Sequence, residues 1–464
     1  MKTLILTIIL AFGFAPALSA AMPVIPGANG FGMTTPAGRG GDVIRVTNLN
    51  RSGSGSLKAC IDAVGPRVCV FEVSGTIQTN ALTWIRNPYI TIAGQTAPEP
   101  GITIVGAGLR VAASDVLIQH ISIRPGDAPD GPSPSVRDAI IIGGNAELGV
   151  ASNIVIDHCS FSWSIDELFS ASAFFWDNLT IRHTLLSDPL DDSFHSKTGT
   201  PGNGDGHGLG MILAGDGARA DVRNSVFTNA RARSPLIRST NSVAVNNVIY
   251  NWRRVATEIS RGDTPSFTDI IENLYIEGPD MENSAAIAIG RTNEPLDSGS
   301  RAYVSGNTRI RQNGSMSSVG ASNRSSSVNI ASSPLHGAVS SATMDSADSD
   351  FLTVILSNVG SRPAMRSPGS VDARIIQGIV NQTGTSVNCV EADGSTRCDR
   401  NAGGWPDDTS VERPLTLPNN PTGDDDGDGY TNLEEWLHTL AAELEVSDMQ
   451  SMKRPGNPGS FGVE

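Results

Sequence analysis

The chain has 464 residues, a formal net charge of −15 at pH 7 and only 5% aromatic residues. The negative charge argues against a nucleic-acid-binding protein, and no segment after the first 21 residues is apolar enough to span a membrane. The length exceeds one ordinary domain, but a solenoid grows linearly with its repeats and can reach it.

Residues 1–21 have the pattern of a secretory signal peptide. Lys2 gives a charged start, Leu4 to Leu18 an apolar run, and Ser19-Ala20-Ala21 a small-residue cleavage site. We therefore expect a secreted protein, either extracellular or periplasmic.

The five cysteines are consistent with export. Cys60 and Cys69 are close in sequence, as are Cys389 and Cys398, and each pair could close a small disulfide loop in an oxidising compartment. Cys159 is left over inside an apolar strand pattern, where we expect a buried free thiol rather than a nucleophile.

The first structural elements predicted are a strand over Val43–Leu49 and a short amphipathic helix over Ser56–Val64. A solenoid exposes a sheet edge and apolar core at an open end. We expect the helix to cap that end.

A repeated phrase then dominates the chain: Ile or Val, any residue, then His or Asn, in a short apolar run preceded by Asn or Asp. Its copies are Ile118-Gln119-His120, Ile156-Asp157-His158, Ile181-Arg182-His183, Val222-Arg223-Asn224, Val245-Asn246-Asn247 and Ile271-Glu272-Asn273. Strands spaced about one coil apart, without helices between them, predict an all-β parallel β-helix.

We assign this β-helix to residues 22–385, with coils from about Val68 to about Val380. The aligned Asn residues are expected to form a hydrogen-bonded ladder. Pro125–Val136 and Ser187–Gly210 interrupt the repeat with long loops, which is where function usually lies on a repeat scaffold.

The C-terminal part contains a linker over residues 386–420, with the possible Cys389–Cys398 loop, then an acidic motif and helix over 421–445. The tail, 446–464, is expected to be disordered. The candidate ligands at calcium-loop spacing are Asp424, Asp426, Asp428, the Tyr430 carbonyl, Asn432 and Glu435. Gly429 supplies the sharp turn, and a helix over Leu433–Leu444 follows. The motif resembles the calcium loops of EF-hand and dockerin modules, and we expect it to act as a structural calcium clip. The alternative is an acidic linker.

Four stretches in order resemble the pectate lyases of polysaccharide lyase family 1, over about residues 25–310. They are Gly38–Leu57, Val73–Ile77 with Ile92–Pro98, Ile154-Val155-Ile156-Asp157-His158, and Arg233-Ser234-Pro235-Leu236-Ile237-Arg238 with Val243–Asn247.

The resemblance implies a right-handed parallel β-helix that cleaves polygalacturonate by β-elimination with Ca²⁺ as cofactor. In this family an arginine takes the C5 proton, and the matching position is Arg233. Arg238 matches an arginine that binds a substrate carboxylate. An arginine base implies an alkaline optimum, because guanidinium is a very poor base near neutrality.

The expected ligands of the active-site calcium are Asp138, Asp166 and Glu167. The family spaces the last two carboxylates about four residues apart, whereas here they are adjacent, with Ser170 at the later position. Since strand neighbours point to opposite faces, we expect only one of the adjacent pair to coordinate. Asp157 and His158 are interpreted as a buried structural pair.

A second departure from the family pattern is Gly210, which stands where a lysine is expected. Lys197 or His207 from the preceding loop could serve instead, with His195 as a further candidate. Trp163, Trp176 and Trp252 could stack on sugar rings, although core packing explains such residues equally simply.

Two other functions remain open besides a pectate lyase. One is a lyase for another uronic-acid polymer or for methylated pectin. The other is a non-catalytic β-helical adhesin or glycan-binding protein. In each case we expect a monomer whose partner is a polysaccharide, which is acidic in the lyase case.

Overall fold

The structure, a computed structural model, describes residues 22–128, 131–172, 175–193, 195, 206–238, 240–260, 262–282, 285–290, 296–323, 329–388 and 410–445. The predicted signal peptide, Cys389, Cys398 and the tail over 446–464 lie outside this part of the chain. None of the helices in the described ranges is both long and apolar enough to cross a membrane.

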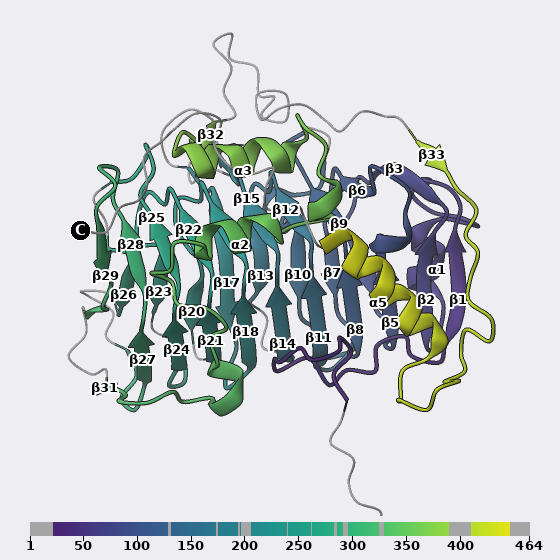
Figure 1. Ribbon diagram of the computed structural model, residues 1–464, viewed down its shortest axis with the longest axis horizontal. Helices are drawn as coiled ribbons and strands as arrows, with labels where there is room; N and C mark the ends of the chain where they lie inside the picture. The colour runs from purple at the N-terminus through teal and green to yellow at the C-terminus, as the bar shows by residue number, and fades with distance from the viewer. Residues whose placement is uncertain are drawn as a thin grey trace, which may run out of the picture.

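Three long sheets wind around a common core and form a parallel β-helix (Figure 1). The first contains β1 (Asp42–Val46), β2 (Arg67–Phe71), β5 (Ile90–Ala93), β8 (Val116–Gln119), β11 (Ala151–Asp157), β14 (Trp176–Arg182), β18 (Arg219–Arg223), β21 (Asn241–Val245), β24 (Phe267–Ile271), β27 (Arg301–Ser305) and β31 (Asn329–Ile330). The second contains β4 (Thr83–Ile85), β7 (Leu109–Val111), β10 (Ile140–Ile142), β13 (Glu167–Ala171), β17 (Leu209–Ala214), β20 (Leu236–Arg238), β23 (Thr257–Ile259), β26 (Ile287–Ile289) and β30 (Ser322–Asn323). We call these the eleven-stranded front sheet and the nine-stranded sheet.

The third sheet contains β3 (Val73–Gln78), β6 (Ile102–Val105), β9 (Ile121–Arg124), β12 (Ser160–Ser162), β15 (Leu185–Ser187), β19 (Val226–Thr228), β22 (Val248–Tyr250), β25 (Leu274–Ile276), β28 (Thr308–Ile310), β29 (Met316–Ser318) and β33 (Val411–Glu412). Its strands are parallel except for the terminal pairings of β28 with β29 and of β3 with β33. A small separate pair joins β16 (Leu190–Asp192) to β32 (Val387–Asn388). The fold predicted from the repeat is thus confirmed.

Alternation along each strand builds the core. On β8, for example, Val116 and Ile118 belong to the central apolar cluster, and the same holds for Leu109 and Val111 on β7. Because every second side chain points inward, the side chains between them face outward on each sheet.

The corner between the front sheet and the third sheet uses left-handed backbone at His120, His158, His183, Asn224 and Asn246. Asn tolerates this conformation better than most residues, and its side chain bonds locally. The sequence repeat predicts a corner residue at these positions as far as Asn224. Beyond Asn224, the strand register of the structure differs from the alignment of the repeat by one residue.

The registers pair Arg223 with Val245 and Val245 with Ile271, so Asn247 and Asn273 lie one position further along than predicted. That shifted position forms the expected ladder. The Asn247 Nδ2 donates to Asn273 Oδ1 at 3.0 Å, and the Asn273 Nδ2 donates to Asn307 Oδ1 at 2.9 Å.

The predicted capping helix is α1 (Leu57–Asp62), with the Ser56 hydroxyl accepting the Ala59 N–H at its start. It packs against β1, β2 and β4 at the first coil. The Cys60–Cys69 disulfide joins α1 to β2, as the sequence suggested, and Cys159 is a buried free thiol whose pKa burial raises to about 12.

The prediction that coils continue to about Val380 is wrong. The chain instead forms α2 (Phe351–Ser357) and α3 (Val371–Asn381), with the 3-10 turns η3 (Gly337–Ser340) and η4 (Pro363–Met365) before them. Ile375 and Ile379 recur at helical spacing and pack on outward residues of the third sheet. Two further 3-10 turns are η1 (Gly94–Thr96) and η2 (Pro134–Val136).

The predicted C-terminal helix is α5 (Asn432–Glu445), and it packs on the β-helix. It lies diagonally across the front sheet (Figure 1), where Leu433 and Leu437 cluster with Val68, Val70 and Ala93. The apolar face of this amphipathic helix is therefore buried against the β-helix.

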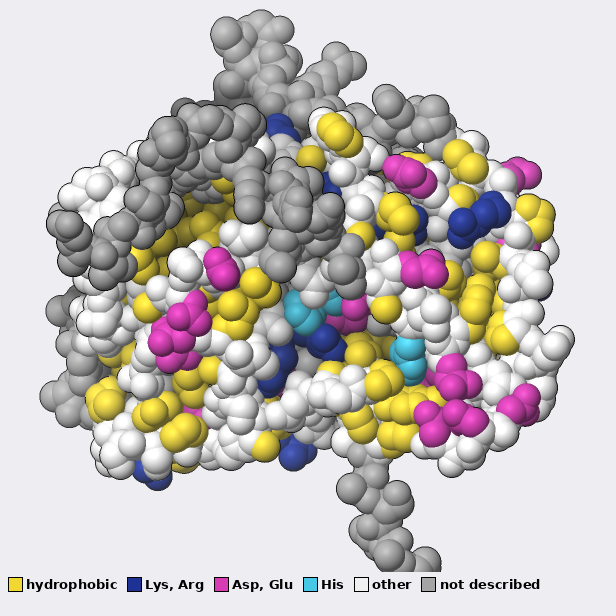
Figure 2. Space-filling model, viewed as in Figure 1, with side chains coloured by type: hydrophobic (Ala, Val, Ile, Leu, Met, Phe, Trp, Pro, Cys, Tyr) yellow, Lys and Arg dark blue, Asp and Glu magenta, His cyan; other side chains and the backbone are white. Residues whose placement is uncertain are grey.

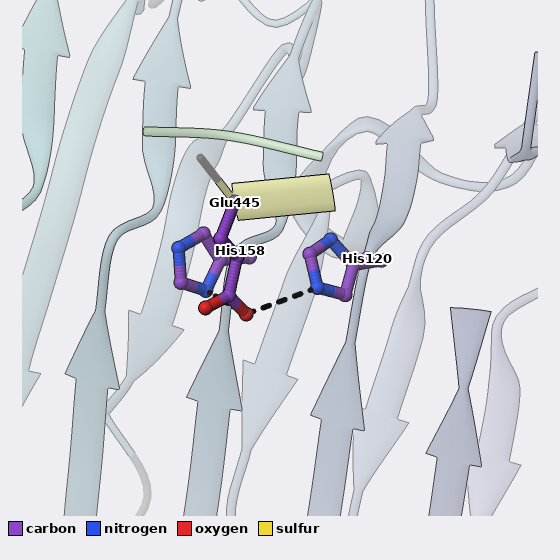
Figure 3. A group of neighbouring side chains, drawn as sticks. All are labelled: His120, His158 and Glu445. Atoms are coloured by element: carbon purple, nitrogen blue, oxygen red, sulfur yellow. Dashed lines mark ion pairs between the residues drawn. The ribbon is translucent and has the colours of Figure 1, made fainter. Parts of the chain in front are cut away.

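The last residue of α5 reaches a stack of histidines at the strand ends. Glu445 Oε1 lies 3.3 Å from His120 Nε2 and 3.2 Å from His158 Nδ1 (Figure 3), and His183 stacks on His158. Figure 2 shows histidine beside acidic and basic side chains near the middle of this face. Glu445 therefore fastens the end of α5 to the corner of the β-helix.

Candidate active site

The candidate active site lies where two neighbouring strands of the nine-stranded sheet, β10 and β13, begin. Asp138 precedes β10, Asp166 precedes β13, and Glu167 is the first residue of β13. Each carboxylate offers an oxygen, and these oxygens all lie within 4.8 Å of one another. Of the two long loops predicted to carry function, Pro125–Val136 leads to Asp138, and Ser187–Gly210 brings His195 and His207 against Asp166.

Both Asp166 and Glu167 contribute an oxygen to this group, whereas alternation along a strand predicts that only one of them coordinates the ion. Asp166 lies in a bend before the strand, so strand alternation does not apply to the pair. Ser170 lies further along β13, and its Oγ forms a hydrogen bond of 3.0 Å with the Oγ of Ser172.

Of the three carboxylates, Asp138 has the fewest hydrogen-bond partners. It is buried, and its Oδ1 has no hydrogen-bond partner within the described residues. Burial and the neighbouring Asp166 raise the pKa of Asp138 well above its ordinary value. Three crowded carboxylates with an unsatisfied oxygen need a positive charge, and an all-oxygen donor set is what Ca²⁺ prefers. The residues present therefore fit a calcium ion.

Two histidines hold Asp166 from the loop side. His207 Nε2 lies 2.9 Å and His195 Nε2 3.5 Å from Asp166 Oδ1. Burial alone would raise the pKa of Asp166, but the hydrogen bonds to His195 and His207 outweigh it and lower the pKa to about 2. His207 was a candidate from sequence, but its pairing with Asp166 had no local signal because 41 residues separate them.

Arg233 faces the same cluster from the segment before β20. Its Nη1 pairs with Glu167 Oε1, and its backbone is left-handed at φ 67°. A non-glycine residue rarely adopts this conformation, and such strain persists only where surrounding structure imposes it.

Gly210 on β17 is part of that surrounding structure. The N–H of Met211 donates to the Arg233 carbonyl at 2.5 Å, and a Cβ at Gly210 would lie 2.3 Å from that oxygen. A lysine at position 210 is therefore sterically excluded, which explains this departure from the family pattern.

The other predicted residues lie apart from the cluster or outside the described residues. Arg238 is exposed at the opposite end of β20, and Lys197 lies in a part of the chain that is not described. The three tryptophans suggested for stacking are all buried, which leaves core packing as their role: Trp163, Trp176 and Trp252.

The C-terminal acidic loop brings carboxylate oxygens of Asp424, Asp426 and Asp428 within 4.8 Å of one another. Asp424 accepts the N–H groups of Gly427 and Gly429 and so shapes the turn. Figure 2 shows acidic side chains grouped on the front face near this loop.

The remaining predicted ligands of this loop are not part of this group of three carboxylates. The Asn432 Oδ1 accepts the N–H of Asp425, the Tyr430 hydroxyl donates to Pro23, and Glu435 is outside the three-carboxylate group. The calcium loop therefore stays a prediction.

A parallel β-helix with a carboxylate cluster facing an arginine on one outer sheet has the architecture of a β-helical polysaccharide lyase. No family model matches the chain. Individual relatives do match along most of its length.

A probable pectate lyase C of Aspergillus flavus is 31% identical over 443 residues, covering 91% of this chain and 95% of that protein. The corresponding protein of Emericella nidulans is 30% identical over 452 residues, covering 91% and 94%. The chain therefore belongs to the pectate lyase family, and it is a polysaccharide lyase.

Solved structures agree on the fold. A Bacillus subtilis pectate lyase variant has a TM-score of 0.51 at 15% identity, covering 74% of this chain and 99% of that one. A thermostable pectate lyase has a TM-score of 0.52 at 13% identity, covering 73% and 97%.

Proposed function

We propose that this protein is a secreted, calcium-dependent pectate lyase that cleaves α-1,4-linked polygalacturonate by β-elimination. The observation that carries the proposal is the group of three carboxylates with an unpartnered buried oxygen on Asp138, directly beside Arg233. An adhesin has no need for such a group.

Asp138, Asp166 and Glu167 would hold the calcium ion. When bound, the ion would supply a positive charge beside the substrate uronate and so make the C5 proton more acidic. His207 and His195 keep Asp166 ionised and oriented for this role.

Arg233 in its neutral form takes the C5 proton, the C4–C5 double bond forms as the bond from C4 to the glycosidic oxygen breaks, and water protonates that oxygen on the leaving sugar. Its guanidinium pairs with Glu167, so it must turn from Glu167 toward the substrate. Its side chain is 28% exposed, which leaves it accessible to substrate. Arg238, further along the same strand, binds a uronate carboxylate.

A substrate panel tests this proposal against the other lyase functions. Purified protein is incubated with polygalacturonate, fully methylated pectin and alginate across neutral and alkaline pH, with product detected as ultraviolet absorbance. We expect cleavage of polygalacturonate, an alkaline optimum and no activity in Arg233→Lys. Preference for methylated pectin or alginate would reassign the substrate.

The C-terminal loop, in this proposal, binds a second, structural calcium through Asp424, Asp426 and Asp428. Its position at the start of α5 supports this role, because an ion there would fix the helix that covers the front sheet.

A further inference from the structure

Trp84 on β4 lies against two guanidinium groups. The Cζ atoms of Arg86 and Arg110 are 4.4 Å and 4.6 Å from the centroid of its ring. Both are within the range of a cation–π contact, which holds a guanidinium in a defined position. Ile85 and Val111 point into the core, so alternation places Trp84 and Arg110 on the outer face.

That outer face is the one that carries the candidate active site. Trp84 is in register with Arg110, Arg110 with Ile141, and Ile141 with Ser170 on β13. Three strand spacings separate β4 from β13, or about 14 Å. A polysaccharide that crosses the strands from the carboxylate cluster would therefore pass over β7 and reach β4.

The contacts of the two arginines differ from those of the other arginines near the site. Arg110 is anchored by Nε and Nη2 bonds to the Gly143 and Gly144 carbonyls, at 3.1 Å each. Across the described chain, neither Arg86 nor Arg110 forms an ion pair. By contrast, Arg231 and Arg253 both pair with Asp191.

Unpaired arginines are notable in a chain with a net charge of −15. Two guanidinium groups held against one tryptophan suit carboxylates spaced along an acidic polymer. Burial lowers the pKa of Arg110 while Asp138 raises it, which reflects the proximity of Arg110 to the carboxylate cluster.

We propose that Trp84, Arg86 and Arg110 form a distal uronate-binding subsite on the outer face of β4 and β7. It would contact only chains long enough to extend from the carboxylate cluster to β4. The inference rests on the proposed function, since it extends the substrate groove of that reaction.

The test compares Arg86→Ala with wild type on digalacturonate, trigalacturonate, hexagalacturonate and polygalacturonate. Arg86 is exposed, so its removal should not unfold the protein. We expect KM to rise about fivefold for the two longer substrates, with unchanged kcat and unchanged kinetics on the dimer and trimer. Trp84→Leu, which removes the ring from both arginines, should show the same length dependence.

Arg301→Ala is the matched control, because Arg301 is exposed at the start of β27 on the front sheet. It removes the same charge and should behave as wild type. An equal effect of Arg86→Ala on all lengths, or none on any, would overturn the subsite.

Failure of the proposed function has a separate signature. If wild type cleaves none of these substrates, polygalacturonate retardation in affinity gels still reports the subsite, which Arg86→Ala should weaken and Arg301→Ala should not. Equal retardation of the three proteins, or no retardation of wild type, would overturn it.

Discussion

At the scale of single residues, the contact between Gly210 and Arg233 positions the candidate base. The absence of a side chain at position 210 lets β17 approach the Arg233 carbonyl, and the resulting bond helps to hold a left-handed arginine. The same glycine explains why the family's lysine has no place here.

Gly210→Ala should therefore impair catalysis without touching a reacting group. A Cβ forced against the Arg233 carbonyl would displace the guanidinium, and misplacement of about 1 Å can cost about a hundredfold in rate. Steady-state kinetics on polygalacturonate measure this. Gly320→Ala, at a glycine with nothing within 4 Å, is the control and should leave the rate unchanged. Equal rates for both variants would contradict the positioning role.

Asp157 and His158 make a second residue-scale prediction, about stability. Burial opposes ionisation of Asp157, but His158 and Arg182 outweigh it and hold the pKa of Asp157 well below its ordinary value. The stabilisation is therefore present above about pH 4 and is lost as pH falls below it.

Asp157→Asn should cost about 3 kcal/mol at pH 7, since it leaves a buried ion pair with one partner. The cost should shrink as pH falls below about 4, where the Asp157 carboxylate gains its proton in the unfolded chain while it stays ionised in the folded protein. Urea unfolding at several pH values measures this. A cost that stays constant down to pH 3 would show that the charge of Asp157 is not the cause.

At the scale of elements, the sequence predicted the strands better than the external helices. Periodic Ile and Val with Asn or His at the corner are a local signal, repeated at each coil. The helix α3 carries an equally local signal in Ile375 and Ile379, which the prediction of continued coils overlooks. Asp166 and Glu167 were both expected ligands, but the alternation that favoured only one of them does not apply, because β13 begins one residue after Asp166.

The docking of α5 leads to a prediction about that helix. Leu437→Ala should lower the free energy of unfolding by about 2–4 kcal/mol, because Leu437 is buried against β2 and β5. KM and kcat at saturating calcium should not change, since the helix lies on a different sheet from the carboxylate cluster. Glu443→Ala, an exposed change on the same helix, is the control for denaturant unfolding. Equal stability of the two variants would contradict the docking.

At the scale of the whole molecule, added segments cover two of the three outer faces. Apolar clusters join the N-terminal segment and α5 to the front sheet, and α2 and α3 to the third sheet. The carboxylate cluster, Arg233 and the Trp84 group all belong to the nine-stranded sheet. Two faces are thus covered by packed segments, and the proposed substrate contacts all lie on the third.

The most direct test of this account is the ultraviolet absorbance of polygalacturonate mixed with the purified protein, first with added calcium and then with excess chelator. The account predicts a steady rise with calcium, which reports unsaturated uronate, and an arrest on chelation. No rise from folded protein at neutral or alkaline pH would contradict the pectate lyase reaction, and a rise that the chelator leaves unchanged would contradict the role assigned to Asp138, Asp166 and Glu167.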